Sequence, residues 1–150
     1  MDASKQYILM CRTAQEIQEC WEPKHGDHYF GTPSGHSLND ERFYEVCIAL
    51  DGDSEGLHFH IEPWYIQQNK KEFIFLPRQD QLQEMVIKNN TIPKYIELQY
   101  RFNKFIIDMD GYNQHSMPKM PVDSLEQLWL SFAMYELYNK IFDGKEWRKK

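Results

Sequence analysis

The stretch FIFLPRQDQLQEMV, residues 73–86, decides the fold class, because a strand-like run changes into a helical one within it. Residues 73–76 are four consecutive apolar residues and predict a buried strand, which Pro77 ends. Beyond the proline, apolar residues return at helical spacing, so a helix begins close to Arg78–Asp80. Asp80 is placed to accept a hydrogen bond at the start of that helix.

On the N-terminal side, residues 4–20 carry the apolar stripe of an amphipathic helix. Pro23 and Gly26 follow it and predict its end. Short runs rich in aromatic and β-branched residues come next, and the links between them favour an antiparallel meander. The predicted strands lie near residues 28–30, 42–50, 57–66 and 72–76. Residues 41–50 also fit a short helix, so two structures stay open for that run.

On the C-terminal side, residues 92–109 fit two structures, because their apolar residues alternate like a strand and also recur at helical spacing. The helix accounts for more residues and is the preferred prediction. Ser124 with Gln127 is a capping-box pattern ahead of a last helix that is apolar around much of its circumference. Gly144 is placed to end that helix.

The order of these elements predicts an α+β fold, in which a small antiparallel sheet packs with N-terminal and C-terminal helices. A chain of 150 residues fits one domain, residues 1–150. We expect a cytoplasmic protein that does not enter a membrane, because no apolar run approaches the ~18 residues of a membrane span and the N-terminus lacks a signal-peptide pattern.

Charge is spread unevenly along the chain, whose formal net charge is −6. Residues 1–66 hold 12 acidic and 4 basic side chains, and the dense basic group at residues 145–150 is typical of a solvated, frayed end. Nucleic-acid binding is therefore not favoured, since it needs a basic patch that neutralises phosphates. The three cysteines, Cys11, Cys20 and Cys47, form no C-x-x-C pair and indicate reduced structural thiols.

The segment at residues 51–62 resembles the twelve-residue calcium loop of an EF-hand. Asp51, Asp53, Glu55 and Glu62 stand at loop positions 1, 3, 5 and 12, and a glycine stands at position 6. The pattern departs from the motif, because position 5 is a glutamate, position 8 is a histidine and a proline follows the loop. A solvated acidic turn fits the same residues.

Histidines supply a second metal hypothesis. On a strand, His58 and His60 point to the same face, as two ligands of one zinc or iron ion must. His25 and His28 could complete such a cluster. Hydrogen-bonded histidines without a metal are the simpler interpretation.

Enzyme signatures are absent from the sequence: there is no phosphate-binding loop, dinucleotide fingerprint, zinc-protease motif or serine elbow. We therefore assign no catalytic residue and expect no cofactor. The prominent aromatic residues are expected to pack in the core or at its edge rather than to stack on a ligand. They are Trp64, Tyr65, Tyr100 and Trp129.

Three stretches together resemble a group of small uncharacterised proteins from phages and prophages of Gram-positive bacteria. They are WEPKHGD at residues 21–27, LPRQDQLQEM at residues 76–85, and SLEQLWL to DGKEW within residues 124–147. The resemblance implies a phage origin and no particular mechanism. It also singles out Arg78, Gln79, Asp80 and Gln81, which either fix the strand–helix junction or present a recognition surface.

Two functions from different classes follow. The favoured one is a non-enzymatic phage or prophage accessory protein that binds another protein, or a second copy of itself, through an apolar surface. The alternative is a metal-binding protein or metal-dependent enzyme that uses His58, His60 and the acids between Asp51 and Glu62.

Overall fold

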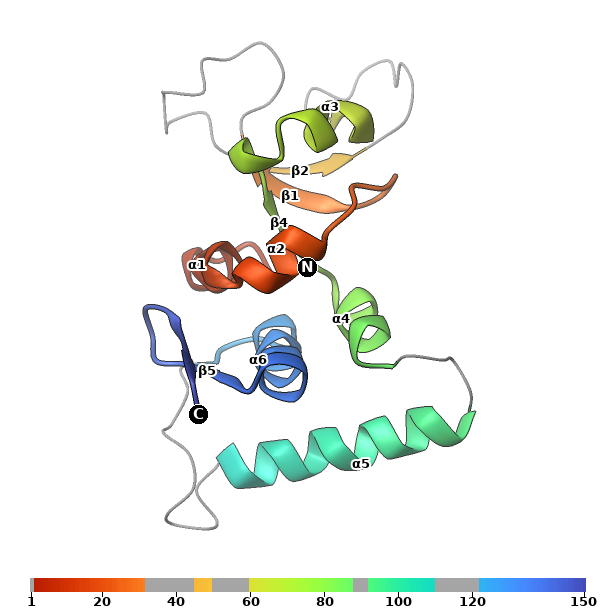
Figure 1. Cartoon of the computed structure of the whole chain (residues 1–150), viewed down its shortest axis with the longest axis vertical. Coiled ribbons are helices and arrows are strands. Elements are labelled where there is room, and N and C mark those ends of the chain that lie inside the picture. The colour runs from red at the N-terminus through yellow and green to blue at the C-terminus, as the bar shows by residue number, and fades with distance from the viewer. Residues whose placement is uncertain (1, 32–44, 50–59, 88–91, 110–121) are drawn as a thin grey trace. The chain divides into compact units, whose positions relative to one another are not determined.

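The computed structural model describes residues 2–31, 45–49, 60–87, 92–109 and 122–150 (Figure 1). These residues form two compact units. One consists of Ala3–Pro77, here the N-terminal unit, and the other of Met1–Asp2 with Arg78–Lys150, here the C-terminal unit. Helices and small sheets occur in both, so the predicted α+β class is confirmed. The prediction of a single domain over residues 1–150 stays a prediction.

The N-terminal unit opens with two helices, α1 (Lys5–Thr13) and α2 (Gln15–Cys20), where the sequence predicts one. Ser4 caps α1 by accepting a hydrogen bond from the backbone of Tyr7 at 3.1 Å. Ala14 interrupts the helix because its backbone, at φ −80° and ψ 66°, lies outside helical geometry. The apolar stripe is buried across both pieces, as the amphipathic pattern predicts.

A four-stranded sheet of order β3-β2-β1-β4 follows these helices. Its strands are β1 (His28–Gly31), β2 (Glu45–Ala49), β3 (His60–Ile61) and β4 (Ile74–Phe75). β1 pairs antiparallel with both β2 and β4. The helical alternative for residues 41–50 is therefore wrong over the described part, 45–49. One pairing departs from the expected meander, because β3 runs parallel to β2.

The strand predicted over residues 57–66 is wrong in its second half. A helix, α3 (Pro63–Gln68), begins directly after β3, and a short 3-10 turn (Lys70–Glu72) leads on to β4. Pro63 is the first residue of α3, where its missing N–H costs no hydrogen bond. Strand-forming composition is overridden here by a helix-starting proline and by the burial of Ile66.

Helix α2 covers the free edge of β4. The side chain of Gln18 donates from Nε2 to the carbonyl of Phe75 at 3.0 Å and accepts from the backbone N–H of the same residue at 2.9 Å. Trp21 stacks on the Phe75 ring with centroids 4.7 Å apart. The Tyr7 hydroxyl donates to the carbonyl of Pro77. The N-terminal helices are thus fixed to the sheet by paired polar contacts and ring stacking.

The described residues of the C-terminal unit form three helices: α4 (Gln79–Val86), α5 (Ile92–Met109) and α6 (Leu125–Tyr138). The preferred helical prediction for 92–109 is confirmed. Aromatic rings join α5 to α6, with Phe102 stacked on Trp129 at 3.8 Å between centroids and Phe105 against Phe132 at 5.4 Å. Of the described helices, none combines the length and the apolar character that crossing a membrane requires.

The predicted cap of α6 is confirmed, and it includes a residue from the start of the chain. Ser124 Oγ accepts from the backbone N–H of Gln127 at 3.2 Å. The Gln127 side chain accepts from the backbone of Asp123 and donates to Asp2 at 2.7 Å. Ser124 also donates to the Asp2 carboxylate at 2.5 Å. Asp2 therefore belongs to the N-terminal cap of the last helix.

The predicted end of the last helix at Gly144 is wrong. α6 stops at Asn139, whose φ of 54° and ψ of 44° place it in the left-handed region, and a hairpin of β5 (Lys140–Phe142) and β6 (Trp147–Lys149) follows. Gly144, at φ 97°, lies in the hairpin turn. Asparagine tolerates the left-handed cap almost as glycine does. The basic tail is consequently a paired strand rather than a frayed end.

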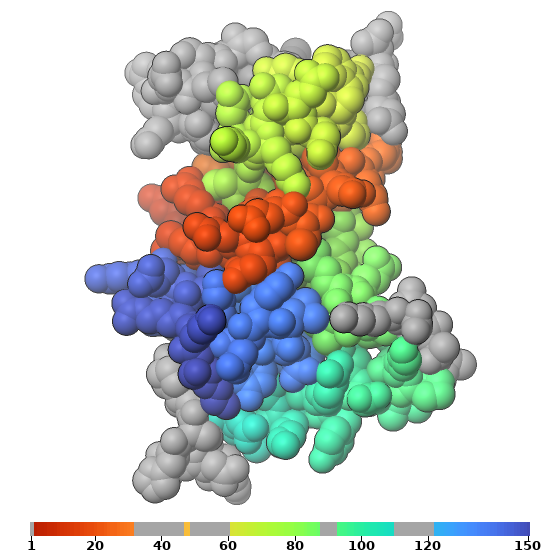
Figure 2. Space-filling model, viewed as in Figure 1, coloured from red at the N-terminus to blue at the C-terminus, as the bar shows by residue number. Residues whose placement is uncertain are grey.

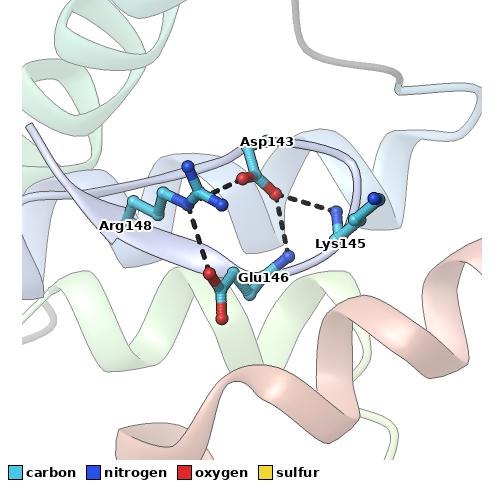
Figure 3. A network of polar contacts seen from close by, with 4 residues as sticks. All are labelled: Asp143, Lys145, Glu146 and Arg148. Atoms are coloured by element: carbon cyan, nitrogen blue, oxygen red, sulfur yellow. Dashed lines mark hydrogen bonds and ion pairs between the residues drawn. The ribbon is translucent and has the colours of Figure 1, made fainter.

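Polar contacts organise the turn of this hairpin (Figure 3). Asp143 Oδ1 accepts hydrogen bonds from the backbone N–H groups of Lys145 at 2.9 Å and Glu146 at 3.0 Å. Arg148 reaches back with Nε 2.7 Å from Asp143 Oδ2. These hydrogen bonds hold the pKa of Asp143 below its usual value, with the N–H of Glu146 as the largest cause and that of Lys145 as the next.

Candidate interaction surface on helix α5

Half of the residues of the two metal hypotheses lie outside the described part of the chain. Asp51, Asp53, Glu55 and His58 all fall within residues 50–59. His60 belongs to β3, and Glu62 is the residue that precedes α3. Among the described residues, no group of three or more His, Cys, Asp or Glu side chains could hold a metal ion. The metal site thus stays a prediction.

The other histidines considered as ligands occupy different settings. His25 lies exposed in the turn before β1, while His28 is half-buried on β1 and pairs across the sheet with Ile48. His25 thus belongs to a turn and His28 to a strand.

Three of the motif residues, Arg78, Asp80 and Gln81, contact one another at the start of α4. The Arg78 guanidinium binds the Asp80 carboxylate through Nε and Nη2, both at 3.1 Å, and the Gln81 side chain accepts from the backbone N–H of Arg78 at 2.9 Å. The hydrogen bonds from Arg78 lower the pKa of Asp80. Gln79 is the first residue of α4. Contacts of this kind are expected if the motif residues fix the junction between the strand and the helix.

Helix α5 presents apolar residues to solvent. Of the eight large hydrophobic side chains that are exposed among the described residues, four lie on α5. Tyr100 is 71% exposed, Ile96 68% and Ile107 54%. Both Tyr100 and Trp129 were expected in the core or at its edge; Trp129 is buried at 3%, whereas the exposure of Tyr100 departs from the expectation. Figure 2 shows α5, in blue-green, at the surface.

Three of these exposed residues form, together with the exposed polar residue Asn103, one continuous stripe, here named the outer stripe: Ile96, Tyr100, Asn103 and Ile107. Their steps of four, three and four residues keep them on one side of the helix. Asn103 accepts a hydrogen bond from the side chain of Gln99 at 3.1 Å. Such spacing is the hydrophobic seam of a helix that packs against another helix.

A second stripe on the opposite side of α5 is buried within the C-terminal unit. It consists of Leu98, Phe102 and Phe105, each at most 5% exposed. Two apolar stripes on opposite sides explain why the sequence of α5 also reads as a strand, because Ile96, Leu98, Tyr100 and Phe102 alternate between them. Only one of the two stripes is covered by α6.

Charged residues line one flank of α5 between the two stripes. They are Lys94, Glu97, Arg101, Lys104 and Asp108. Arg101 Nη1 donates to Glu136 Oε2 of α6 at 2.7 Å, with the two side chains 38% and 20% exposed. This ion pair joins α5 to α6 on the side of the helix away from the outer stripe.

A pocket of about 390 Å³ adjoins this charged flank. Its walls come from α4, α5 and α6, with Val86, Ile87 and Leu137 supplying the apolar part. The polar wall has two basic side chains, Lys94 and Arg101, and two acidic ones, Glu97 and Glu136. The formal charges of this polar wall therefore sum to zero. The outer stripe is the more distinctive feature of the unit.

The residues of the outer stripe were missed by sequence reasoning as a site. Their spacing of four, three and four residues could have indicated an exposed helical stripe. Ile96 and Tyr100, however, also belong to the alternating pattern that is typical of a strand. Comparison of the chain with models of known protein families, with curated proteins and with solved structures gave no match.

Proposed function

We propose that this protein is a non-enzymatic interaction module that binds an amphipathic helix along the outer stripe of α5. The observation that carries the proposal is the exposure of Ile96, Tyr100 and Ile107 on one face of an 18-residue helix. Clustered large apolar side chains at a surface mark an interaction site more often than scattered ones do. Helices with apolar residues at steps of three and four bind partners of the same kind.

Contacts with α6 support the proposal because they hold the inner side of α5. Ring stacking of Phe102 on Trp129 and the Arg101–Glu136 ion pair fix the inner side of the helix. A prearranged surface loses little conformational entropy when it binds a partner. The resemblance to phage and prophage proteins makes an accessory role in a phage or its bacterial host part of the same proposal.

Site-specific photo-crosslinking in bacterial cells tests this function. A photoreactive phenylalanine analogue replaces Tyr100 in one variant and Glu84, which is exposed on α4, in the control. We expect a polypeptide adduct at position 100 that maps to an amphipathic helix and disappears when Ile96→Glu is added. Labelling of position 100 that does not exceed labelling of position 84 would overturn the proposal.

A further inference from the structure

We infer that the helix bound along the outer stripe is α5 of a second copy of this chain, running antiparallel. This inference rests on the proposed function and names its partner. In heptad terms, Ile96 and Asn103 are equivalent positions, and so are Tyr100 and Ile107, because each pair is seven residues apart. The outer stripe is therefore a two-heptad seam that a second seam of the same kind can fill.

The antiparallel register matches residues of different size across the seam. A two-fold axis beside the middle of α5 brings Ile96 of one copy against Ile107 of the other. The same axis brings Tyr100 against Asn103, so the large ring meets the small amide side chain at the centre. Both contacts occur twice by symmetry, as an isologous interface requires.

Charge complementarity supports the second copy as the occupant. Glu97 and Lys104 follow the seam positions Ile96 and Asn103, so both lie on the same flank of the stripe. Both are exposed, and among the residues that the structure describes neither forms an ion pair within the chain. They are about 10 Å apart along one helix, which is too far to pair with each other. In the antiparallel register, Glu97 of each copy lies beside Lys104 of the other.

The position of the charges also selects the orientation. When two helices pack antiparallel, the same flank of each helix lies together, so the charged flanks meet. When they pack parallel, the charged flank of one copy meets the opposite flank of the other, which carries Gln99 and Ile106. Only the antiparallel arrangement forms the Glu97–Lys104 pairs.

The expected dimer is weak. An 18-residue helix is about 27 Å long, and one helix pair of that length buries less than the ~1,200–2,000 Å² of a standard stable interface. A dissociation constant of about micromolar order is therefore expected.

Sedimentation equilibrium of the purified full chain, from about 1 µM to about 1 mM, tests the inference. We expect the wild type to dimerise and Glu97→Lys to weaken the dimer by at least about tenfold, because two lysine pairs would then face each other. The double variant Glu97→Lys with Lys104→Glu should restore the wild-type affinity. Glu84→Lys, which makes the same charge change on α4, should leave the affinity unchanged. A monomeric wild type, or a dimer insensitive to Glu97→Lys, would overturn the inference.

Disulfide trapping tests the orientation separately, in a Cys20→Ser background that removes the exposed native thiol. Chains with Ile96→Cys mixed with chains with Ile107→Cys should form a disulfide-linked heterodimer. Neither variant alone should crosslink efficiently. Efficient crosslinking of each variant with itself would show a parallel pair and overturn the antiparallel inference.

The photo-crosslinking experiment distinguishes failure of the dimer from failure of the interaction module. An adduct of twice the chain mass at position 100 supports the second copy. An adduct with a different protein, together with a monomeric wild type, overturns the dimer and leaves the interaction module standing. A monomer without any adduct at position 100 overturns both.

Discussion

The indole Nε1 of Trp21 donates a hydrogen bond to Oδ2 of Asp27 at 2.9 Å, across the turn that joins α2 to β1. The same carboxylate oxygen accepts from the backbone N–H of Lys24 at 2.8 Å. Asp27 is 3% exposed, and Gly26 beside it has a φ of 84°. One buried carboxylate thus fixes both ends of the chain reversal.

Replacing Asp27 with alanine should destabilise the protein by about 2–4 kcal/mol, because it leaves the donors of Trp21 and Lys24 without their acceptor. Urea denaturation followed by tryptophan fluorescence measures the change. Glu22→Ala, an exposed acid in the same turn, is the matched control and should cost less than about 0.5 kcal/mol. Equal losses in both variants would contradict the role given to Asp27.

Gly31 is expected to tolerate no side chain. A Cβ atom at this position would overlap the ring of Phe73, which is 4% exposed and so has little room to move. Gly31→Ala should therefore lower the free energy of unfolding by about 1–3 kcal/mol. In the variant that also carries Phe73→Leu, the added cost of the alanine should shrink. A cost that is the same with Phe or Leu at position 73 would show that the overlap is not its cause.

The Arg101–Glu136 ion pair should contribute modestly to stability. Both side chains are partly exposed, so a double-mutant cycle with Arg101→Met and Glu136→Gln should give a coupling of about 0.5–1 kcal/mol. Because the screening length falls to about 3 Å at 1 M salt, the coupling should shrink there. A coupling that grows with salt would argue against an electrostatic origin.

The hairpin turn predicts a pH dependence. Asp143 has a lowered pKa in the folded protein, so the stability it contributes is present above the unfolded value of about 3.9 and is lost as the pH falls through the folded pKa. Carboxyl NMR titration measures that pKa directly. Arg148→Ala should leave most of the lowering in place, because the backbone N–H groups of Glu146 and Lys145 are its larger causes. A return to the ordinary value in Arg148→Ala would reverse that ranking.

Local patterns predicted most elements of the fold correctly. A few neighbouring residues are enough to predict the apolar stripe of residues 4–20, the capping pair at Ser124 and the helix after Pro77. Such signals do not depend on long-range packing, which explains why they could be recognised. The break at Ala14 has no comparable signature, since alanine is a strong helix former.

Other features depend on distant contacts or on competing signals. Asn139 ends α6 five residues before Gly144, because two further strands, β5 and β6, pair after it. The basic residues of this segment carry no pattern that predicts those strands. The outer stripe was hidden because a helix with two apolar faces resembles a strand in sequence. Which of its faces is covered depends on α6, more than twenty residues farther along the chain.

The contacts of Asp2 set an order for folding during synthesis. The N-terminal unit is built from a continuous segment, Ala3–Pro77, whose contacts are available once that segment has left the ribosome. The cap of α6 needs Asp2 to meet Ser124 and Gln127, which are made 122 and 125 residues later. The segment around Asp2 must therefore remain accessible until α6 emerges, and the C-terminal unit can be completed only after that helix has been made.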